Sequence, residues 1–405
     1  MKRFEVVFNI PSPYRLHMLR ELHRQLTARG IDFHVHFMAR GHKERPKSWL
    51  NPEIDFPHTY WKDYGFGQHH FNPGLVWYIL RNPPEWLLAG SPYDTFTCIL
   101  ILLLAKIPVK IVGAEGNTKT PGRLGGVIGW LKRKIYATAK YASVPGKDAA
   151  EYFALHQART KSRMPRPVIM PNLVDECRFK PRREWPEDQI NATRMELGVE
   201  AGTRLCMIPA RFDPVKGLLE FVDVLSAKDC EGWRFAVFGH GPLREAFELR
   251  VAQKNMSHLF RIVESVPYDD MPRFYAASDL MLLPSLQDMN PLSVPEALFS
   301  GLPIALSDQA GNVEEGVSEG LNGWRLPVKN ANRFGEVLRD VFSSSIDRLR
   351  QMGRVSLEKN AKFWATKDAV RNYLDVIVGV KEDASEGCRV SVDREGKVKK
   401  WNDVK

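Results

Sequence analysis

The feature that most constrains the fold is a repeated alternation of short apolar runs with longer amphipathic segments. In the first half, "FEVVFNI" and "DFHVHFM" have the pattern of strands around a predicted helix at residues 14–29. In the second half, five predicted strands each lead into a loop and then a helix or turn: "RLCMIPA", "WRFAVFG", "LFRIVE", "DLMLLPS" and "PIALSD". Strands that alternate with helices form parallel sheets covered on both faces. The pattern therefore predicts an α/β protein with two doubly wound domains.

The domain boundaries are predicted where the composition changes. At 405 residues the chain is long enough for two or three domains of about 150 residues. We predict an N-terminal Rossmann-like domain over 1–175, a polar linker over 176–200 and a C-terminal Rossmann-like domain over 201–362. A helix over 363–380, which can return to the N-terminal domain, precedes a polar tail over 381–405.

Composition excludes several classes of protein. With 44% hydrophobic and 26% charged residues the chain is typical of folded soluble proteins. The longest apolar run, "CILILLLA" at 98–105, is much shorter than the roughly 20 residues that span a bilayer, and we interpret it as buried core. The N-terminus lacks the pattern of a signal peptide. Neither the five cysteines nor the histidines have the spacing of a disulfide framework or metal site, so we predict a cytoplasmic protein without a metal.

Positive charge is concentrated in the first half. Residues 1–175 hold 25 lysines and arginines against 13 acidic residues, which indicates an anionic partner. The segment 126–142 predicts a basic amphipathic helix, and the loop 39–49 adds further cations. Each cation near an anionic leaflet can contribute about 1 kcal/mol, so this half could attach to the cytoplasmic face of a membrane. The alternative is a core-packed helix with a solvated basic face.

Two carboxylates, Asp288 and Glu296, lie eight positions apart around an Asn-Pro break. On one helix they would be separated by about 12 Å, which is too far for the ~5.5 Å pair of a retaining hydrolase. Asn290 suits a helix N-cap and Pro291 a first helical residue, and the following two amides would then be free to bind an anion. Those amides belong to Leu292 and Ser293. The alternative is a capped helix flanked by two solvated acids.

Two further loops follow predicted strands of the same domain. "ARFDPVKG" places Arg211 and Lys216 five residues apart, which suits a diphosphate. "FGHGP" places Gly239 and Gly241 where a ligand could approach the backbone closely. Each loop alone is equally typical of a solvated turn.

Taken together and in this order, the motifs over residues 204–326 resemble those of glycosyltransferase family 4, which has the GT-B fold of two Rossmann-like domains facing across a cleft. The resemblance implies that Arg211 and Lys216 hold the nucleotide diphosphate, that Asp288 contacts the donor sugar and that Glu296 binds the ribose. It places the "GxGP" loop and the helix amides at the donor as well. It also implies retention at the anomeric carbon and no required metal or cofactor.

The resemblance therefore implies an enzyme that moves a sugar from a nucleotide diphosphate donor to a glycan or lipid-linked acceptor, in polysaccharide or glycolipid biosynthesis. The first acid is Asp288 where the family has Glu, and "MNP" replaces an aromatic-glycine pair, so the sugar pocket differs. Candidate acceptor-side residues follow strands of the first half: Ser12, Tyr14, Arg15 and Glu115.

Other functions remain open at this point. A sugar-nucleotide epimerase or a phosphorylase on the same fold would share the donor site. A nucleic-acid-binding protein would fit the basic half, but the sequence has no helix-turn-helix, zinc finger or RNP motif, so we predict no nucleic-acid partner.

Overall fold

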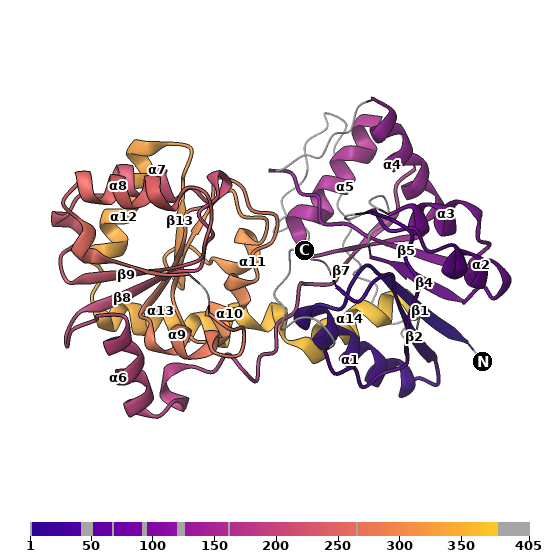
Figure 1. Cartoon of the computed structure of the whole chain (residues 1–405), viewed down its shortest axis with the longest axis horizontal. Helices are drawn as coiled ribbons and strands as arrows, with labels where there is room; N and C mark the ends of the chain where they lie inside the picture. Colours follow the sequence, from indigo (N-terminus) through magenta and orange to yellow (C-terminus); the bar gives the residue numbers. More distant parts are fainter. Residues whose placement is uncertain are drawn as a thin grey trace, which may run out of the picture. The chain divides into compact units, whose positions relative to one another are not determined.

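The computed structural model describes residues 2–41, 52–66, 69–90, 95–119, 126–160, 163–264 and 266–379. The chain divides into two compact units (Figure 1). Unit 1 comprises Met1–Leu173 and Thr366–Lys405, and unit 2 comprises Val174–Ala365. Each contains one parallel sheet with helices on both faces, which confirms the predicted α/β class of two Rossmann-like domains.

The sheet of unit 1 has the order β3-β2-β1-β4-β5-β6-β7, with β1 near its centre. Successive side chains of β1 and β2 point to opposite faces: Phe4, Val6 and Phe8 of β1 share one core with Phe33, Val35 and Phe37 of β2, whereas Val7 of β1 belongs to the other core. The strands are β1 (Arg3–Phe8), β2 (Asp32–Phe37), β3 (His58–Tyr60), β4 (Trp86–Ala89), β5 (Val109–Gly113), β6 (Tyr141–Val144) and β7 (Arg166–Ile169).

Helices cover both faces of this sheet (Figure 1). One face carries α1 (Pro13–Thr27) and α14 (Thr366–Val378). The other carries α2 (Pro73–Arg81), α3 (Phe96–Leu104), α4 (Gly126–Thr138) and α5 (Lys147–Thr160). The two faces bury separate apolar cores.

Two sequence-based interpretations of unit 1 are corrected. The basic helix predicted over 126–142 is shorter, because α4 ends at Thr138 and Ala142 lies in β6. Most of the predicted basic loop, residues 42–49, lies outside the described residues.

The run at 98–105 is only partly core, because α3 has one face against the sheet and one toward solvent. Among the described residues no helix has the length and apolar character needed to cross a membrane.

Helix α14 comes from the far end of the chain and completes unit 1. Its apolar side chains belong to the same core as α1 and β1. Polar contacts fix it further: Trp86 Nε1 donates to the Ile377 carbonyl at 3.2 Å, and Arg29 pairs with Asp375 at 2.7 Å. The helix predicted over 363–380 is therefore part of unit 1, with bounds 366–378.

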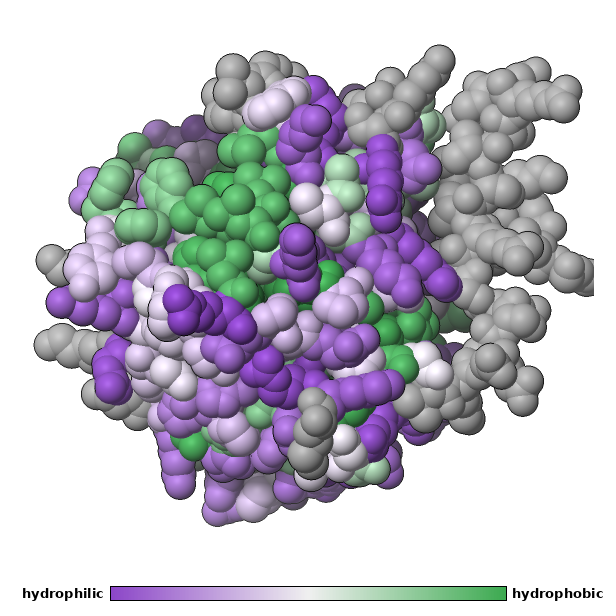
Figure 2. Space-filling view, turned by 90° about the vertical axis from the view of Figure 1, so that its right-hand side faces the viewer, coloured by the Kyte–Doolittle hydropathy of each residue, from purple (hydrophilic) through white to green (hydrophobic). Residues whose placement is uncertain are grey.

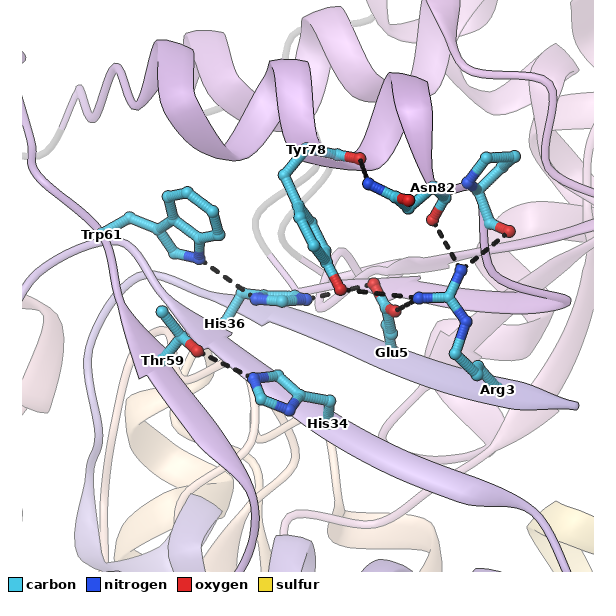
Figure 3. A network of polar contacts seen from close by, with 9 residues as sticks. Arg3, Glu5, His34, His36, Thr59, Trp61, Tyr78 and Asn82 are labelled. Atoms are coloured by element: carbon cyan, nitrogen blue, oxygen red, sulfur yellow. Dashed lines mark hydrogen bonds and ion pairs between the residues drawn. The ribbon is translucent and has the colours of Figure 1, made fainter. Parts of the chain in front are cut away.

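A buried polar network joins β1 and β2 to the underside of α2 (Figure 3). Glu5 and His36 are almost fully buried, and Glu5 Oε2 lies 3.1 Å from His36 Nε2. Arg3 Nη1 donates to Glu5 Oε1 at 2.7 Å. The Tyr78 ring of α2 packs on the His36 ring, with centroids 5.4 Å apart. A buried carboxylate thus has a cationic partner and a hydrogen-bond donor, as burial requires.

The geometry assigns the protonation of His36. Trp61 Nε1, which can only donate, lies 3.1 Å from His36 Nδ1, so Nδ1 accepts. The proton is therefore on Nε2, which donates to Glu5. The neighbouring His34 is neutral at physiological pH, because burial lowers its pKa to about 4, with a smaller contribution from His36. Arg3 and Glu5 are therefore the charged pair of this network.

The sheet of unit 2 has the order β10-β9-β8-β11-β12-β13. The five predicted strands are present, and a sixth, β13, extends the edge. The sequence did not reveal β13, "GWRL", in which only Trp324 and Leu326 are buried apolar residues. The strands are β8 (Arg204–Ile208), β9 (Trp233–Phe238), β10 (Phe260–Val263), β11 (Leu280–Leu283), β12 (Ile304–Ser307) and β13 (Gly323–Leu326).

Helices again lie on both faces of the unit 2 sheet (Figure 1). One face carries α7 (Leu218–Val224), α8 (Arg244–Gln253) and α12 (Ala331–Ser343). The other carries α6 (Glu187–Glu196), α9 (Met271–Ala277), α10 (Ser293–Phe299) and α13 (Ile346–Glu358), and the short α11 (Val313–Gly316) packs beside α10.

The predicted linker over 176–200 is instead a packed part of unit 2. Phe179 and Leu197 are buried in its core. Helix α6 lies against α9, and Arg194 Nη1 donates to the Ala277 carbonyl at 2.7 Å. The segment is rich in charge because its outer face is solvated, while single apolar residues anchor its inner face.

Candidate active site

The predicted donor-site residues follow three strands that are neighbours in the unit 2 sheet, in the order β9-β8-β11, and β12 is the next strand along. In a parallel sheet the carboxyl ends of all strands meet at one edge. The loops after these strands are joined by contacts that run from one loop to the next. Segments far apart in the sequence therefore build one continuous site within unit 2.

The loops after β8 and β9 touch through glycines. A Cβ on Gly239 would lie 2.4 Å from the Ala210 carbonyl oxygen, and one on Gly241 would lie 2.7 Å from the Phe212 carbonyl oxygen. Both distances are shorter than real side chains tolerate, so only glycine fits. The "FGHGP" loop thus lies directly against the backbone that carries Arg211.

The loops after β8 and β11 meet at an ion pair. Lys216 Nζ lies 2.5 Å from Asp288 Oδ2, and the two side chains are only 19% and 12% exposed. Gly217 has φ +66° and approaches the Pro284 carbonyl so closely that a side chain would collide. A mostly covered charge pair of this kind keeps both groups in fixed positions, since separating them would leave two desolvated charges.

The loops after β11 and β12 are held by the backbone of Asp288. Its carbonyl accepts from the Gly311 amide at 3.0 Å. Asn312 is buried, and its Nδ2 donates to the Pro291 carbonyl at 3.0 Å. The segment between Asp288 and α10 is therefore braced from the β12 side.

Helix α10 begins later than the sequence indicated. Its first residue is Ser293 and its N-cap is Leu292, so the predicted cap Asn290 and first residue Pro291 lie before the helix. Pro295 consequently falls in the first turn, where a missing N–H breaks no helical hydrogen bond. The Leu292 and Ser293 amides still lie at the start of the helix.

Glu296 lies on α10 and faces α9. Tyr275 Oη donates to Glu296 Oε2 at 2.6 Å. Burial raises the pKa of Glu296 to about 7, while the Tyr275 hydrogen bond and the charge of Arg178 act in the opposite direction. A carboxyl with this pKa exists as acid and carboxylate in similar amounts at neutral pH, which is common at functional sites.

The two predicted cations of this site have different surroundings. Lys216 is mostly covered by its contact with Asp288. Arg211 is 63% exposed, and its guanidinium pairs with Asp213 at 2.8 Å. Exposed pairs of this type contribute little to stability, so the Arg211 side chain can leave Asp213 for a ligand at small cost.

A cavity lies at the carboxyl edge of the unit 1 sheet. Its volume is about 230 Å³, and it is lined by residues that follow β1, β4, β5, β6 and β7. Tyr14, Arg15 and Glu115, three of the four predicted acceptor-side residues, line it. Arg15 Nη1 donates to Asn9 Oδ1 at 2.5 Å. Ser12 is buried at the N-cap of α1 and does not line the cavity.

Sequence reasoning missed residues that support the predicted ones. Ser285, whose Oγ lies 3.5 Å from Asp288 Oδ2, is the second residue after β11 and could have been found from its position after a strand. Tyr275, Asn312 and Asn9 act through contacts between distant segments. No local pattern in the sequence indicates those contacts.

Metal ligands are not grouped in the described ranges, where no three His, Cys, Asp or Glu side chains lie together as a metal site requires. The expectation that the reaction needs no metal stays a prediction.

The chain is similar to known proteins over part of its length. Residues 190–361 match the family described as Glycosyl transferases group 1. The chain is 33% identical over 250 residues to 2-deoxystreptamine glucosyltransferase of Streptomyces kanamyceticus, covering 59% of this chain and 60% of that protein. It is 25% identical over 279 residues to the putative glycosyltransferase EpsF of Bacillus subtilis, covering 64% and 69%.

A further relative is the amylovoran biosynthesis glycosyltransferase AmsK of Erwinia amylovora, 25% identical over 181 residues and covering 40% of this chain and 44% of that protein. The chain thus spans about half to two thirds of the length of these relatives.

Solved structures identify the fold. The structure of Anabaena Alr3699/HepE in complex with UDP superimposes with a TM-score of 0.72 at 14% identity, covering 94% of this chain and 100% of that one. WaaG, a glycosyltransferase involved in lipopolysaccharide biosynthesis, gives a TM-score of 0.64 at 15% identity, covering 93% and 100%. The fold is therefore GT-B, as the resemblance in the sequence implied.

Proposed function

We propose that this chain is a glycosyltransferase that binds a nucleotide diphosphate sugar on unit 2 and transfers the sugar to a glycan or lipid-linked acceptor. The observation that carries the proposal is the Lys216–Asp288 pair, held at 2.5 Å between the loops after β8 and β11. At the same edge of the sheet, Gly217 packs closely against the loop after β11, and Gly239 and Gly241 pack closely against the loop after β8. The group 1 family match over residues 190–361, and relatives named glycosyltransferases, support it.

In the proposed reaction, the bond between the anomeric carbon and the diphosphate oxygen breaks, and its electron pair stays on the diphosphate. An acceptor hydroxyl forms the new bond, and its proton passes to the departing phosphate. Negative charge therefore develops on the diphosphate, where Lys216 and Arg211 are placed to stabilise it. The Leu292 and Ser293 amides at the start of α10 would bind the same phosphates. We propose retention of configuration, with attack from the leaving-group face.

Asp288 and Glu296 take different parts of the donor in this proposal. Asp288 fixes Lys216 and contacts the sugar, with Gly239 and Gly241 allowing the donor close to the backbone. Glu296 accepts hydrogen bonds from the ribose hydroxyls when it is ionised. Its raised pKa then makes nucleotide binding weaken as the pH falls below about 7, because the protonated form loses acceptor capacity.

We propose that the acceptor binds the unit 1 cavity lined by Tyr14, Arg15 and Glu115. One relative is named for amylovoran biosynthesis and another as a 2-deoxystreptamine glucosyltransferase, so the proposed acceptor class stays at the level of a glycan or a lipid-linked glycan. Peripheral attachment of unit 1 to a cytoplasmic membrane face belongs to the same proposal.

A thermal-shift screen with UDP-, GDP- and ADP-sugars tests the donor assignment. A ligand at 100 times its Kd adds about 2.7 kcal/mol to the free energy of unfolding. We expect one nucleotide class to raise the Tm of the wild type and to raise that of Lys216→Ala much less. No shift with any nucleotide sugar would contradict the proposal. Consumption of the donor without an acceptor, giving an isomeric nucleotide sugar, would show an epimerase instead.

A further inference from the structure

Helix α3 has an apolar outer face that the fold does not use. Phe96, Leu103 and Leu104 are exposed, although they lie on a helix whose opposite side is buried in the unit 1 core. Spacings of seven and eight residues place these three side chains on the same face. A helix that is apolar all round normally lies inside a protein, so this outer face lacks the cover that its composition calls for.

Neighbouring elements extend this face. Helix α3 packs against both α2 and α4. Together with the loop before α2, these elements expose eight large apolar side chains, each between 40% and 78% exposed. The apolar surface of unit 1 consists of Tyr64, Phe66, Trp77, Leu80, Phe96, Leu103, Leu104 and Trp130. Figure 2 shows this end of unit 1, where hydrophobic side chains gather in one broad patch bordered by hydrophilic ones.

Cations border this apolar surface and contact its aromatic rings. Arg81 lies over the Trp77 ring at 4.3 Å, Lys62 over Tyr64 at 4.9 Å and Lys134 over Trp130 at 5.9 Å. The sequence from 61 to 140 contains ten lysines and arginines against four acidic residues. An apolar centre with tryptophans and cations around it is the composition of surfaces that lie at the boundary between lipid headgroups and acyl chains.

We propose that the apolar surface of unit 1 docks on an anionic lipid leaflet, with the outer face of α3 inserted among the acyl chains and the cations at the headgroups. The charge distribution favours lipid over a second copy of this chain, because two copies meeting through this face would bring their basic borders together. The inference rests on the proposed function, in which unit 1 attaches to a membrane face, and deepens it by naming the surface that makes the contact.

Vesicle sedimentation tests the surface with a matched pair of variants. Leu103→Glu combined with Leu104→Glu places two charges on the outer face of α3. The control is Leu249→Glu on α8 of unit 2, where Leu249 is 62% exposed, against 58% for Leu104. We expect wild type and control to bind phosphatidylglycerol vesicles, and the α3 variant to bind about tenfold more weakly or less. All three should bind neutral phosphatidylcholine vesicles poorly.

Two measurements distinguish insertion from electrostatic attraction: the salt dependence of vesicle binding and the depth of Trp77 in the bilayer. Raising the salt to 0.5 M should weaken binding of the wild type without abolishing it, because the apolar contribution is not screened. Brominated lipids should quench the fluorescence of Trp77, and the Trp77→Phe variant should lose that part of the quenching. Equal binding by the α3 variant and the wild type, or no binding by either, would overturn the proposal. A dimer in light scattering that the α3 variant converts to monomer would overturn it in favour of self-association.

Failure of this inference is separable from failure of the proposed enzyme activity. Lys216→Ala should bind vesicles like the wild type while losing donor-dependent Tm shifts. The α3 variant should keep the full Tm shift with the nucleotide sugar while losing vesicle binding. An α3 variant with wild-type circular dichroism and Tm excludes misfolding as the cause.

Discussion

Units 1 and 2 share one architecture but hold the ion pairs Arg3–Glu5 and Lys216–Asp288 at different positions in it. Unit 2 gathers charge at the carboxyl edge of its sheet, where Lys216 and Asp288 join two loops. Unit 1 holds the pair of Arg3 with the buried Glu5 under α2 on a face of the sheet (Figure 3). It also leaves apolar side chains of α3 in solvent, whereas the five large apolar side chains exposed in described parts of unit 2 are on separate elements.

The comparison shows what each unit is built to hold. Charge at strand ends in unit 2 can act on a ligand, since the loops there are open to solvent at one side. Beneath α2 in unit 1, Glu5 is buried and Arg3 is one third exposed, and Arg3 contacts Tyr78 and Asn82, so this network holds the helix on the sheet. Helix α2 is held by this network and α3 packs against α2, so the outer residues of both helices have fixed positions, as a docking surface needs.

The largest effect should come from breaking the buried pair of unit 1. Glu5→Gln leaves Arg3 without its carboxylate, and we expect a loss of about 3 to 5 kcal/mol in the free energy of unfolding, near the lower value because Arg3 is one third exposed. Hydrogen exchange should show the loss in unit 1 alone. The control Glu314→Gln breaks an exposed pair with Arg325 and should cost under about 1 kcal/mol. Equal effects in both units would mean that they do not unfold separately.

The second prediction concerns the raised pKa of Glu296 in unit 2. The unfolded carboxyl titrates near 4.5 and the folded one near 7, so the folded state binds the additional proton between these values. The free energy of unfolding therefore falls as the pH rises through this range. Glu296→Gln removes the effect and should stabilise the protein by up to about 3 kcal/mol at pH 8 and by little at pH 4.5.

Urea unfolding at the two pH values checks this, and calorimetric titration should show weaker nucleotide binding by the same variant. A variant that is equally stable at both pH values relative to wild type would show that Glu296 is not desolvated. One that binds nucleotide like the wild type would remove the ribose contact.

The third prediction compares the two cations of the donor site. Lys216→Ala and Arg211→Ala should each cost about 1.5 to 3 kcal/mol of transition-state stabilisation, or about 10- to 150-fold in kcat/KM. The covered Lys216 should give the larger effect, because its position is fixed by Asp288. Asp288→Asn should lower kcat more than affinity. The exposed cation Lys228 provides the control, and a loss of activity in Lys228→Ala similar to that of Lys216→Ala would remove the distinction.

The smallest effect should come from Tyr275→Phe. It removes a hydrogen bond that lowers the pKa of Glu296, so the pKa rises further. We expect the pH midpoint of nucleotide binding to move upward by less than about one unit, for a bond worth about 1 kcal/mol. Combined with Glu296→Gln, the substitution should have no pH effect. A downward shift would show that Tyr275 does not donate to Glu296.

Much of the fold could be predicted because apolar periodicity is local. The strands β1, β2, β8, β9 and β11 stand out as apolar runs followed by small or polar residues. Strand β13 and the packing of 176–200 could not be predicted, since both depend on single apolar residues whose burial is decided by distant segments. The start of α10 was misplaced by two residues because Asn290 and Pro291 suit a cap that the loop after β12 overrides.

The sequence placed the candidate residues after strands but did not indicate their pairings. Order along the chain indicated that Arg211, Lys216 and Asp288 follow strands of one domain. The Lys216–Asp288 contact depends on the order of the strands in the sheet, and this order cannot be read from the sequence. The run at 98–105 was interpreted as core because composition reports how apolar a helix is and not which of its faces the fold covers.

The return of α14 to unit 1 has a consequence for how the protein is made. A ribosome synthesises residues 1–173 first, yet the core of unit 1 lacks Val370, Tyr373 and Leu374 until nearly the whole chain has emerged. Unit 2 is continuous in sequence and can fold as soon as its last strand and helices are available. Until α14 has been synthesised, the face of the unit 1 sheet that carries α1 therefore lacks part of its apolar cover. A chain terminated after unit 2 would carry a finished donor-site unit attached to an unfinished neighbour that chaperones and proteases recognise by its exposed core.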